Sequence, residues 1–450
     1  MSQKLILTSI FFTLLPLTVI SQNVLEKYVN EGIENNLSLQ EKNISLEQSL
    51  LALETAKSYF LPAVDFGFTY NLSKGGRSIQ LPIGDLLNDV YSTLNDLTSS
   101  DRFPLVENVS QQFLPNNFYD ARFRITLPVV NPDLHFQKEI REQQVIVSEL
   151  DLEIYRATLI EDIKTAYYNY CTAFKAIEVL ESSAELVQRN LKDNQSLLEN
   201  GKGLPASVLR AESEVENIRA LMIEAENRKL NASYYLNFLI NKPLDSEVIY
   251  ESQDIDQAHL QALLIEDNLD TRPELLQVST LQQIRETSLL QSKRYWVPRI
   301  NTFADLGSQE FNFEFSTQNS AYAFFGLNLN FPIFHGGRNQ QHIRLSELNL
   351  VASNLQKNQL ENKLSMDLKM AKNAVISSQA ALKSSEKKLT SSEAYLRLVD
   401  RGFREGANSL IEFIDARNQY TQASLQQTIN TYSLLISQTK LERQLTIDNY

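Results

Sequence analysis

The sequence predicts an α+β membrane protein in which two copies of one unit combine strands of bilayer length with long coiled-coil helices. The first observation is a repeat: AKSYFLPAV at 56–64 returns as SKRYWVPRI at 292–300. The others are segments that alternate apolar and polar side chains, and long stretches without Gly or Pro. Because internal repeats mark duplicated structural units, we predict a first repeat over 22–270 and a second over 271–450.

The N-terminal segment 1–21 is predicted to be an export signal peptide. MSQK supplies positive charge, an apolar core follows, and Val19 and Ser21 suit the positions before a cleavage site. Gln22 would then begin the mature chain. An uncleaved anchor is the alternative. Beyond this segment no apolar run reaches the ~20 residues that a transmembrane helix requires.

The composition argues against several function classes. A net charge of −13 disfavours a nucleic-acid partner, which requires a basic surface. The one cysteine, Cys171, leaves no internal disulfide and lies in a helical pattern, where we expect it to be buried. The sequence contains no phosphate-binding loop and no nucleophile–base set. Metal-ligand spacing is also missing from the four histidines, His135, His259, His335 and His342. We therefore predict no enzyme activity, cofactor or metal.

The alternating segments are predicted to be β-strands. They cover about 62–72, 119–129, 298–308 and 322–333. Alternation with a period of two places apolar side chains on one face and polar ones on the other. The segment lengths match tilted strands that cross a bilayer.

A soluble antiparallel sheet with one face on a core is the alternative interpretation of these strands. The export signal disfavours it, and so does the small number of strands. Prolines also mark the expected junctions between strand and helix, at Pro62, Pro128, Pro298 and Pro332. An open sheet edge in lipid leaves backbone groups unpaired, so several chains must each donate four strands to a closed barrel. The residues expected to face its wet lumen are Asp65, Arg122, Arg124, Asn301, Asp305 and Asn328.

The connections within the two strand pairs differ in length. Residues 72–120 form a long polar connection punctuated by Pro and Gly, whereas 307–321 is short. Outer-membrane barrels carry their long loops on the outside. The long connection is either a variable surface loop or a segment folded over the barrel mouth, and its conformation is not predicted.

The stretches 133–200, 338–401 and 407–450 contain neither Gly nor Pro and are predicted to be long helices. Apolar and small residues recur in them every seven positions, which predicts a coiled-coil seam. The first seam comprises Tyr170, Ile177, Ala184, Leu191 and Leu198, interleaved with Ala173, Leu180 and Val187. The second comprises Val375, Leu382, Leu389, Leu396 and Phe403, interleaved with Ser378, Ser385, Ser392 and Val399.

Each long helix is predicted to end at a glycine turn, the tip of a helical hairpin. The tips are expected at about 200–206 and 402–408, where Gly201 aligns with Gly406. Glycine suits a helix end because it adopts the left-handed conformation of a C-cap without strain. Gly203 follows in the first turn.

Taken together, these features resemble the TolC-like outer membrane factor (outer membrane efflux protein) family of Gram-negative bacteria. The similarity covers essentially the whole mature chain. It rests on the lead-in helix that ends in a proline before a strand, on RPEL at 272–275, on FPIFHGGRNQ at 331–340, and on both glycine tips. The order and duplication of these motifs carry the resemblance.

The resemblance implies a homotrimer with a twelve-stranded barrel in outer-membrane lipid, four strands coming from each chain. The helices would continue as a coiled-coil periplasmic barrel, with an equatorial region that includes about 243–270. The tips at Gly201, Gly203 and Gly406 would meet a periplasmic adaptor (membrane fusion) protein, itself joined to an inner-membrane pump.

Two carboxylates after the second tip are candidates for a constriction. Glu412 and Asp415 are three residues apart and share a helix face. The resemblance places acidic residues six and nine positions after this glycine at the periplasmic end, where a trimer turns them into rings that concentrate cations. The alternative is that both residues only offset the dipole at a helix N-terminus.

The chain departs from the family at the contacts that hold the tip closed. The resemblance leads us to expect a Tyr and an Arg near the second glycine and an Asp on the other hairpin. This chain has Phe403, Asn408 and Ser207 at those positions. Other contacts must hold any resting closure.

The sequence favours a passive exit duct of a tripartite efflux or type I secretion system, gated at the periplasmic tips. The alternative is an exported structural or adhesive trimeric coiled-coil protein without a pore. The cargo cannot be predicted, because selection occurs at the pump. The sequence also does not indicate which pump and adaptor the chain would serve.

Overall fold

The computed structural model describes residues 23–313 and 320–445, so the predicted signal peptide at 1–21 lies outside the described residues. The chain forms two compact units, and each takes segments from both sequence repeats. The helical unit comprises the described residues of Met1–Glu47, Ile146–Thr280 and Asn354–Tyr450. The sheet unit comprises those of Gln48–Val145 and Leu281–Ser353.

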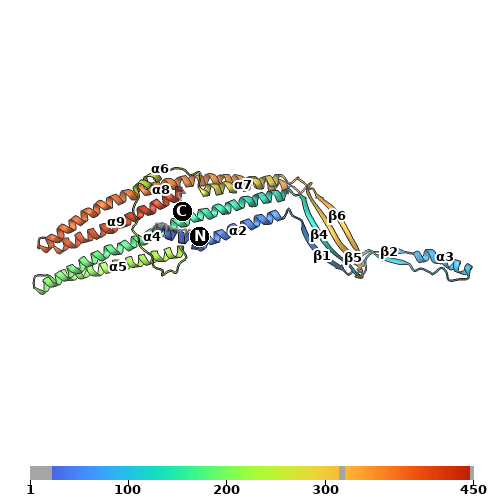
Figure 1. Cartoon of the computed structure of the whole chain (residues 1–450), viewed down its shortest axis with the longest axis horizontal. Coiled ribbons are helices and arrows are strands. Elements are labelled where there is room, and N and C mark those ends of the chain that lie inside the picture. The colour runs from blue at the N-terminus through green and yellow to red at the C-terminus, as the bar shows by residue number, and fades with distance from the viewer. Residues whose placement is uncertain (1–22, 314–319, 446–450) are drawn as a thin grey trace, which may run out of the picture. The chain divides into compact units, whose positions relative to one another are not determined.

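The sheet unit contains a four-stranded antiparallel sheet in the order β1-β4-β5-β6. Its strands are β1 (Ala63–Asn71), β4 (Phe118–Val130), β5 (Arg299–Phe311) and β6 (Ala321–Asn330). Strands β1 and β6 are therefore its edges (Figure 1).

Two prolines that were expected to mark strand ends act differently. β6 ends at Asn330, before the predicted limit of 333, and Pro332 restricts the residue before it and donates no backbone hydrogen bond. In contrast, β4 continues past Pro128 to Val130 through a shift in register against β5. Pro128 therefore does not end its strand as expected, because a β-bulge accommodates a residue without an N–H.

The register gathers most polar side chains on one face of the sheet, together with Phe303 and Phe324. Asp65 pairs with Arg124, which in turn pairs with Asp305. Directly opposed residues share a face, so polar side chains of three strands lie together. The other face is apolar and open to solvent in the single chain. It carries Val64, Phe66, Phe68, Phe123, Leu306, Phe325, Leu327 and Leu329.

The helices lie before and after the strands. They are α1 (Val24–Asn35), α2 (Leu37–Ser58), α4 (Pro132–Glu199), α5 (Pro205–Leu239), α6 (Gln257–Ile265), α7 (Pro273–Lys293), α8 (Arg338–Arg404) and α9 (Leu410–Leu445). Proline is the first residue of three of them, where its fixed φ is preorganised and its missing N–H costs nothing. No helix in the described part of the chain is both long and apolar enough to span a membrane.

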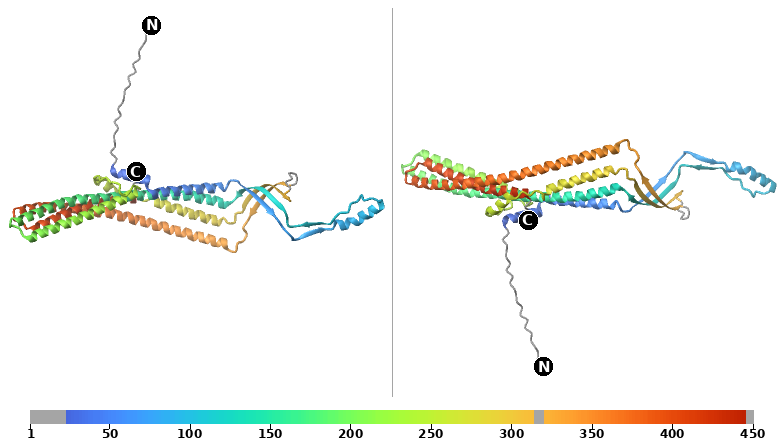
Figure 2. Two further views of the ribbon diagram at one scale, coloured as in Figure 1. Left: turned by 90° about the horizontal axis from the view of Figure 1, so that it is seen from below. Right: turned by 90° about the horizontal axis from the view of Figure 1, so that it is seen from above.

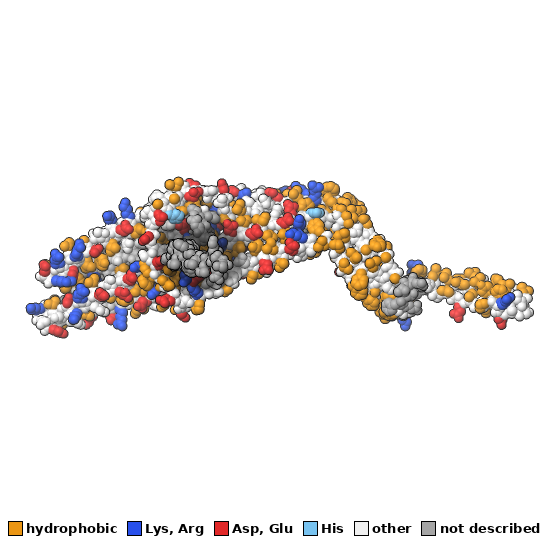
Figure 3. All heavy atoms as spheres, in the orientation of Figure 1, with side chains coloured by type: hydrophobic (Ala, Val, Ile, Leu, Met, Phe, Trp, Pro, Cys, Tyr) orange, Lys and Arg blue, Asp and Glu red, His pale blue; other side chains and the backbone are white. Residues whose placement is uncertain are grey.

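Two helical hairpins, α4–α5 and α8–α9, make up most of the helical unit (Figures 1 and 2). Charged side chains gather over the helices, whereas hydrophobic ones dominate the visible part of the sheet (Figure 3).

The core of the helical unit lies where α1, α4 and α5 meet. Val29 and Ile163 are fully buried there, and Cys171 is buried as predicted. Two tyrosine hydroxyls fix the chain that follows α5: Tyr170 donates to the Val248 carbonyl at 2.6 Å, and the Ile249 N–H donates to the Tyr28 hydroxyl at 2.9 Å. Burial raises the pKa of Tyr170 to about 12, so its hydroxyl remains a donor at neutral pH.

The seams of the long helices are less apolar than the heptads predict. Ala173, Leu180 and Val187 of α4 are buried, and the same seven-residue step then reaches buried Asn194. In α8, the buried positions near the tip include Ser385 and Ser392. Hydroxyls also pair between helices, as between Ser183 of α4 and Thr421 of α9 at 3.0 Å. The seams are therefore held by polar contacts as well as by apolar packing.

Candidate functional site

The first tip is a glycine turn between α4 and α5. Gly201 has φ = +68°, and its N–H donates to the Leu198 carbonyl. The Lys202 N–H reaches back to the Leu197 carbonyl at 2.8 Å, the pattern of a Schellman C-cap. A Cβ on Gly203 would lie 2.7 Å from the Leu198 nitrogen, so only glycine lets the chain pass so closely. Helix α5 then begins without a side-chain cap.

The second tip, between α8 and α9, uses the same glycine conformation. Gly406 has φ = +76°, and the Ala407 N–H donates to the Gly402 carbonyl at 2.7 Å. A Cβ on Gly402 would collide with the present position of the Asn408 amide, so the Asn408 side chain would have to move. The two turns are equivalent up to this point.

They differ at the start of the returning helix, where Ser409 and Glu412 form a capping box. The Glu412 carboxylate accepts from the Ser409 N–H at 2.7 Å, and the Ser409 hydroxyl accepts from the Glu412 N–H at 3.3 Å. The hydrogen bond from the Ser409 backbone lowers the pKa of Glu412. The structure thus gives Glu412 the helix N-terminal role that the sequence left as an alternative.

Asp415 lies one turn further along α9, exposed like Glu412. Its carboxylate accepts from the Gln419 side chain at 2.7 Å on the same helix. Unlike Glu412, Asp415 forms no hydrogen bond with the first turn of α9 in the described part of the chain, and its carboxylate lies at the surface. The two candidate constriction residues therefore differ in how firmly they are fixed.

A buried ion pair, not found from the sequence, joins the two hairpins near the tips. Arg417 of α9 is 1% exposed and donates to Glu214 of α5 at 2.7 Å. Arg210 approaches the other carboxylate oxygen of Glu214 from the surface at 3.1 Å. Burial lowers the pKa of Arg417, and the Glu214 carboxylate opposes this effect. The available signal was a glutamate at helical spacing between buried Ala211 and Ile218.

The ion pair is only partly satisfied. The Arg417 Nε is buried and has no hydrogen-bond partner among the described residues. A buried charge with an unmet donor holds its surroundings less firmly than a fully bonded one.

The three positions at which the chain departs from the family are explained by other contacts. Phe403 stacks on Phe413, with ring centroids 5.3 Å apart, in an apolar cluster. Asn408 donates to the Glu412 carboxylate at 3.3 Å. Ser207 lines a groove of about 550 Å³ between the first turns of α5 and α9. The structure therefore brings the two tips together without a Tyr–Asp or Arg–Asp contact at these positions.

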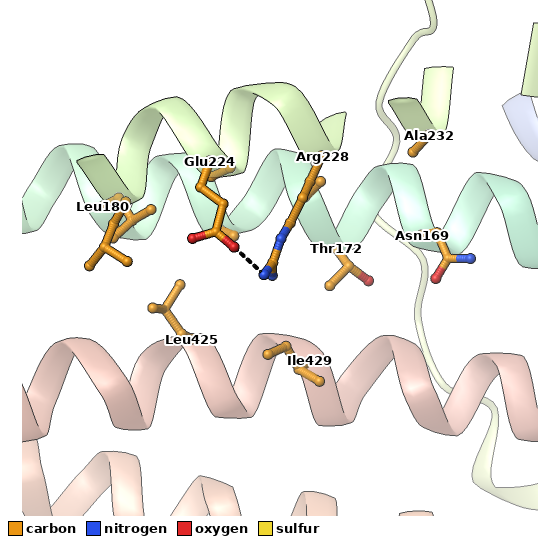
Figure 4. A pocket seen from close by; sticks show the side chains of 12 residues that line it. Asn169, Thr172, Leu180, Glu224, Arg228, Ala232, Leu425 and Ile429 are labelled. Carbon is orange, nitrogen blue, oxygen red and sulfur yellow. Dashed lines mark hydrogen bonds and ion pairs between the residues drawn. The ribbon is translucent and has the colours of Figure 1, made fainter. Parts of the chain in front are cut away.

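A separate cavity of about 370 Å³ lies between α4, α5 and α9 (Figure 4). Its lining is mainly aliphatic, and Leu425 and Ile429 of α9 face α4 and α5 across it. Its two charged side chains, Glu224 and Arg228, pair with each other. It leaves no charge free to bind a ligand.

The polar face of the sheet contains all six residues predicted to face a lumen. Arg124 binds Asp305 with two hydrogen bonds of 2.7 and 2.6 Å, and this fork leaves Asp305 2% exposed. Arg122 pairs with Asp120 at 2.7 Å. Register alone puts Asp65 opposite Arg124, and Asn301 opposite Asn328. Two pairs of charges on this face therefore neutralise each other, whereas Asp65 stays exposed.

The RPEL motif forms a buried network between α7 and the end of α9. Arg272 binds Glu274 through two hydrogen bonds of 3.0 and 2.9 Å and donates to the Gln444 carbonyl. Arg443 adds a third contact to Glu274 at 2.6 Å. Burial opposes ionisation of Glu274, but the two guanidinium groups outweigh it and lower its pKa to about 2. The motif is structural in this chain.

No group of three or more His, Cys, Asp or Glu side chains in the described residues is arranged to hold a metal ion. The candidate functional regions are the two tips, the ion pair of Arg417 and Glu214, and the polar face of the sheet.

This combination of a sheet with one polar and one apolar face and two long helical hairpins is the fold of outer membrane channels. Over 94% of this chain, the Campylobacter jejuni CmeC outer membrane channel superposes with a TM-score of 0.76 at 16% identity, covering 85% of that protein. VceC from Vibrio cholerae superposes with a TM-score of 0.75 at 12% identity, covering 94% of this chain and 95% of VceC.

Sequence comparison finds similarity to the same group of proteins. Residues 264–445 match the family described as outer membrane efflux protein. The outer membrane protein TolC of Escherichia coli is 18% identical over 438 residues, 94% of this chain and 82% of TolC. The probable efflux pump outer membrane protein TtgC of Pseudomonas putida is 22% identical over 392 residues, 81% of this chain and 79% of TtgC. The chain is thus similar over most of its length to TolC-like outer membrane factors, proteins of the outer membrane of Gram-negative bacteria with a large periplasmic part.

Proposed function

We propose that this chain is one third of an outer-membrane exit duct that conducts substrates passively from the periplasmic side to the exterior. The observation that carries the proposal is the sheet with one polar and one apolar face and two free edges, β1 and β6. In lipid, both edges must pair. Three copies with four strands each give a closed barrel of twelve, apolar outside toward lipid and polar toward a lumen.

The polar face suits a wet but weakly charged passage. Arg124 and Asp305 bind each other, as do Arg122 and Asp120, so both arginines of β4 are neutralised and Asp65 is the exposed charge of β1. Such a lining passes varied solutes without selecting among them. This supports a generic duct in which selection occurs at a partner pump.

Gating is proposed at the periplasmic helix tips. Two hairpins meet there through the buried pair of Arg417 and Glu214, which is only partly satisfied. An adaptor protein that binds the turns at Gly201, Gly203 and Gly406 would favour one arrangement of α5 against α9 by differential contact. The adaptor would in turn connect the duct to an inner-membrane pump.

The exposed carboxylates after the second tip are proposed to form the constriction. Trimer symmetry repeats Asp415 and Glu412 three times around one axis. Because Glu412 is bound to its own helix start and Asp415 is not, we assign most of the cation selectivity to Asp415.

Single-channel conductance of the purified protein in planar bilayers tests the proposal. We expect a conducting, cation-selective channel that is blocked by multivalent cations, with D415N weakening selectivity and block more than E412Q. E226Q, an exposed carboxylate on α5 away from the tips, is the matched control and should change neither. A purified protein that passes no ions would favour the alternative, a structural coiled-coil protein without a pore. Equal effects of D415N and E226Q would refute the constriction.

A further inference from the structure

The long connection between β1 and β4 is an ordered projection and not a plain surface loop. It contains β2 (Ser78–Leu81), α3 (Ile83–Thr98) and β3 (Val109–Gln112), with β2 and β3 paired as a ribbon. Figure 2 shows the ribbon carrying α3 away from the sheet. The projection leaves the end of the sheet opposite to the helices, because β1 follows α2 and β4 precedes α4.

One side of α3 is fixed to the chain that returns from it. The Asn88 amide accepts from the Val106 N–H at 2.9 Å and donates to the Val106 carbonyl at 3.0 Å. Asn95, two turns later, makes the same pair of bonds to Phe103 at 2.9 and 2.8 Å. These two amides hold the helix in place together with the Tyr91 ring, whose centroid lies 6.0 Å from that of Phe103.

Most of the apolar side of α3 is exposed to solvent in the single chain, and Leu94 is half-buried. Its stripe comprises Ile83, Leu86, Leu87, Val90, Leu94 and Leu97. Leu86 is 70% exposed, Val90 53% and Leu97 77%. An amphipathic helix with its apolar side open to water marks an interaction surface.

The charge of α3 disfavours a lipid surface as the occupant of this stripe. The polar side carries Asp85, Asp89 and Asp96, and the helix contains no Lys or Arg. Helices that lie in a membrane interface carry Lys and Arg on the polar side to bind anionic lipid. Three aspartates would be repelled instead.

The pattern of the stripe favours two further copies of the same helix. Leu87 and Leu94 occupy heptad positions a, and Ile83, Val90 and Leu97 occupy positions d. Leucine at a with β-branched residues at d, as at two of these three d positions, favours trimers or tetramers over dimers. The stripe is also continuous with an interface that the duct requires, because the projection begins where edge strand β1 ends.

We propose that the α3 stripes of three copies pack together as a parallel three-helix bundle at the outer end of the duct. This inference rests on the trimer of the proposed function. Two heptads are too short to associate by themselves, but attachment to one barrel gives the helices an effective concentration in the millimolar range. The bundle therefore forms only in the assembled protein, with Asp85, Asp89 and Asp96 on its outside.

Cross-linking between copies tests the bundle. V90C puts a thiol at the centre of the stripe, and D89C puts one on the polar side of the same turn as the matched control. The native Cys171 is buried and provides a low background. We expect a short bismaleimide to cross-link detergent-purified V90C at least about tenfold more than D89C, because packed helices hold the d positions close.

Native mass spectrometry of the same samples separates the inference from the proposed function. A trimer in which V90C and D89C cross-link equally, or not at all, overturns the bundle and leaves the duct standing. A monomeric protein overturns both. A dye on the V90C thiol that changes its emission only with phosphatidylglycerol vesicles would identify lipid as the occupant and overturn the bundle. Introducing L87D and L94D together into V90C should abolish its cross-link while the trimer persists.

Discussion

The two helical tips make the same turn from different residues. Both reverse the chain at a glycine with positive φ, Gly201 in the first and Gly406 in the second. The first then enters its next helix at Pro205 without a side-chain cap, and the second does so through the Ser409–Glu412 capping box. The first tip therefore has a neutral helix start, and the second has a carboxylate.

The comparison of the two tips shows that the glycine turn and the charge of the helix that follows it are set by different residues. The glycine conformation sets the reversal, whereas the residues after it determine which charge faces solvent. The Arg417–Glu214 pair then joins the unlike tips across α5 and α9. The following predictions test how far each tip depends on its own residues and how far on this shared contact.

The largest effect is expected from breaking the shared pair. E214A leaves Arg417 buried without a carboxylate, which should cost about 3–5 kcal/mol of unfolding free energy. Urea unfolding measures the loss, and conductance should show a more open channel if this contact holds the tips together. R210A removes only the exposed partner of Glu214 and serves as the control, with a cost of about 0–1 kcal/mol. A more stable E214A protein would show that the pair does not hold the hairpins together.

A smaller effect is expected from the two glycines, and it should be equal at both tips. G201A and G406A force a Cβ into the left-handed region, at a cost of about 1–2 kcal/mol each. Nothing lies within 4 Å of either added Cβ, so backbone strain is the only penalty. Thermal unfolding with hydrogen exchange at each tip measures the loss. Clearly unequal losses would mean that the two turns are not equivalent.

The smallest effect should appear at the second tip alone. S409A removes its cap and should cost about 1 kcal/mol. Because folding lowers the pKa of Glu412, its contribution is fully present above the ordinary glutamate pKa and is lost as the pH falls through the folded value. Hydrogen exchange should therefore show weaker protection of the first turn of α9 at acid pH. The first turn of α5, which has no such cap, should not change, and an equal change there would contradict this account.

The sequence predicts best what depends on short periodic patterns. Alternation was sufficient to find all four sheet strands, and it placed Asp65, Arg124 and Asp305 on one face before their register was known. The glycine tips could be predicted equally well, because glycine is the residue that most readily adopts a positive φ.

Contacts between distant residues could not be predicted in this way. Arg417 and Glu214 are 203 residues apart in the sequence. The pattern of residues in either helix alone does not indicate that the two side chains meet. The projection was missed for another reason: its turn residues suggested an irregular loop, although Ile83, Val90 and Leu97 recur at helical spacing. The helical spacing of these apolar residues was visible in the sequence, but the many polar residues around them favoured the prediction of a loop.

The two unpaired edges of the sheet have a consequence for how the protein is made. A single chain that has folded its four strands still exposes the backbone of β1 and β6 and an apolar face. Such a species aggregates at its edges in water and is not viable in lipid. If three copies close one barrel as proposed, barrel folding is not unimolecular, and its rate rises with the concentration of chains. A mutation that only slows encounter between copies would thus lower the yield of a protein whose finished structure is unchanged.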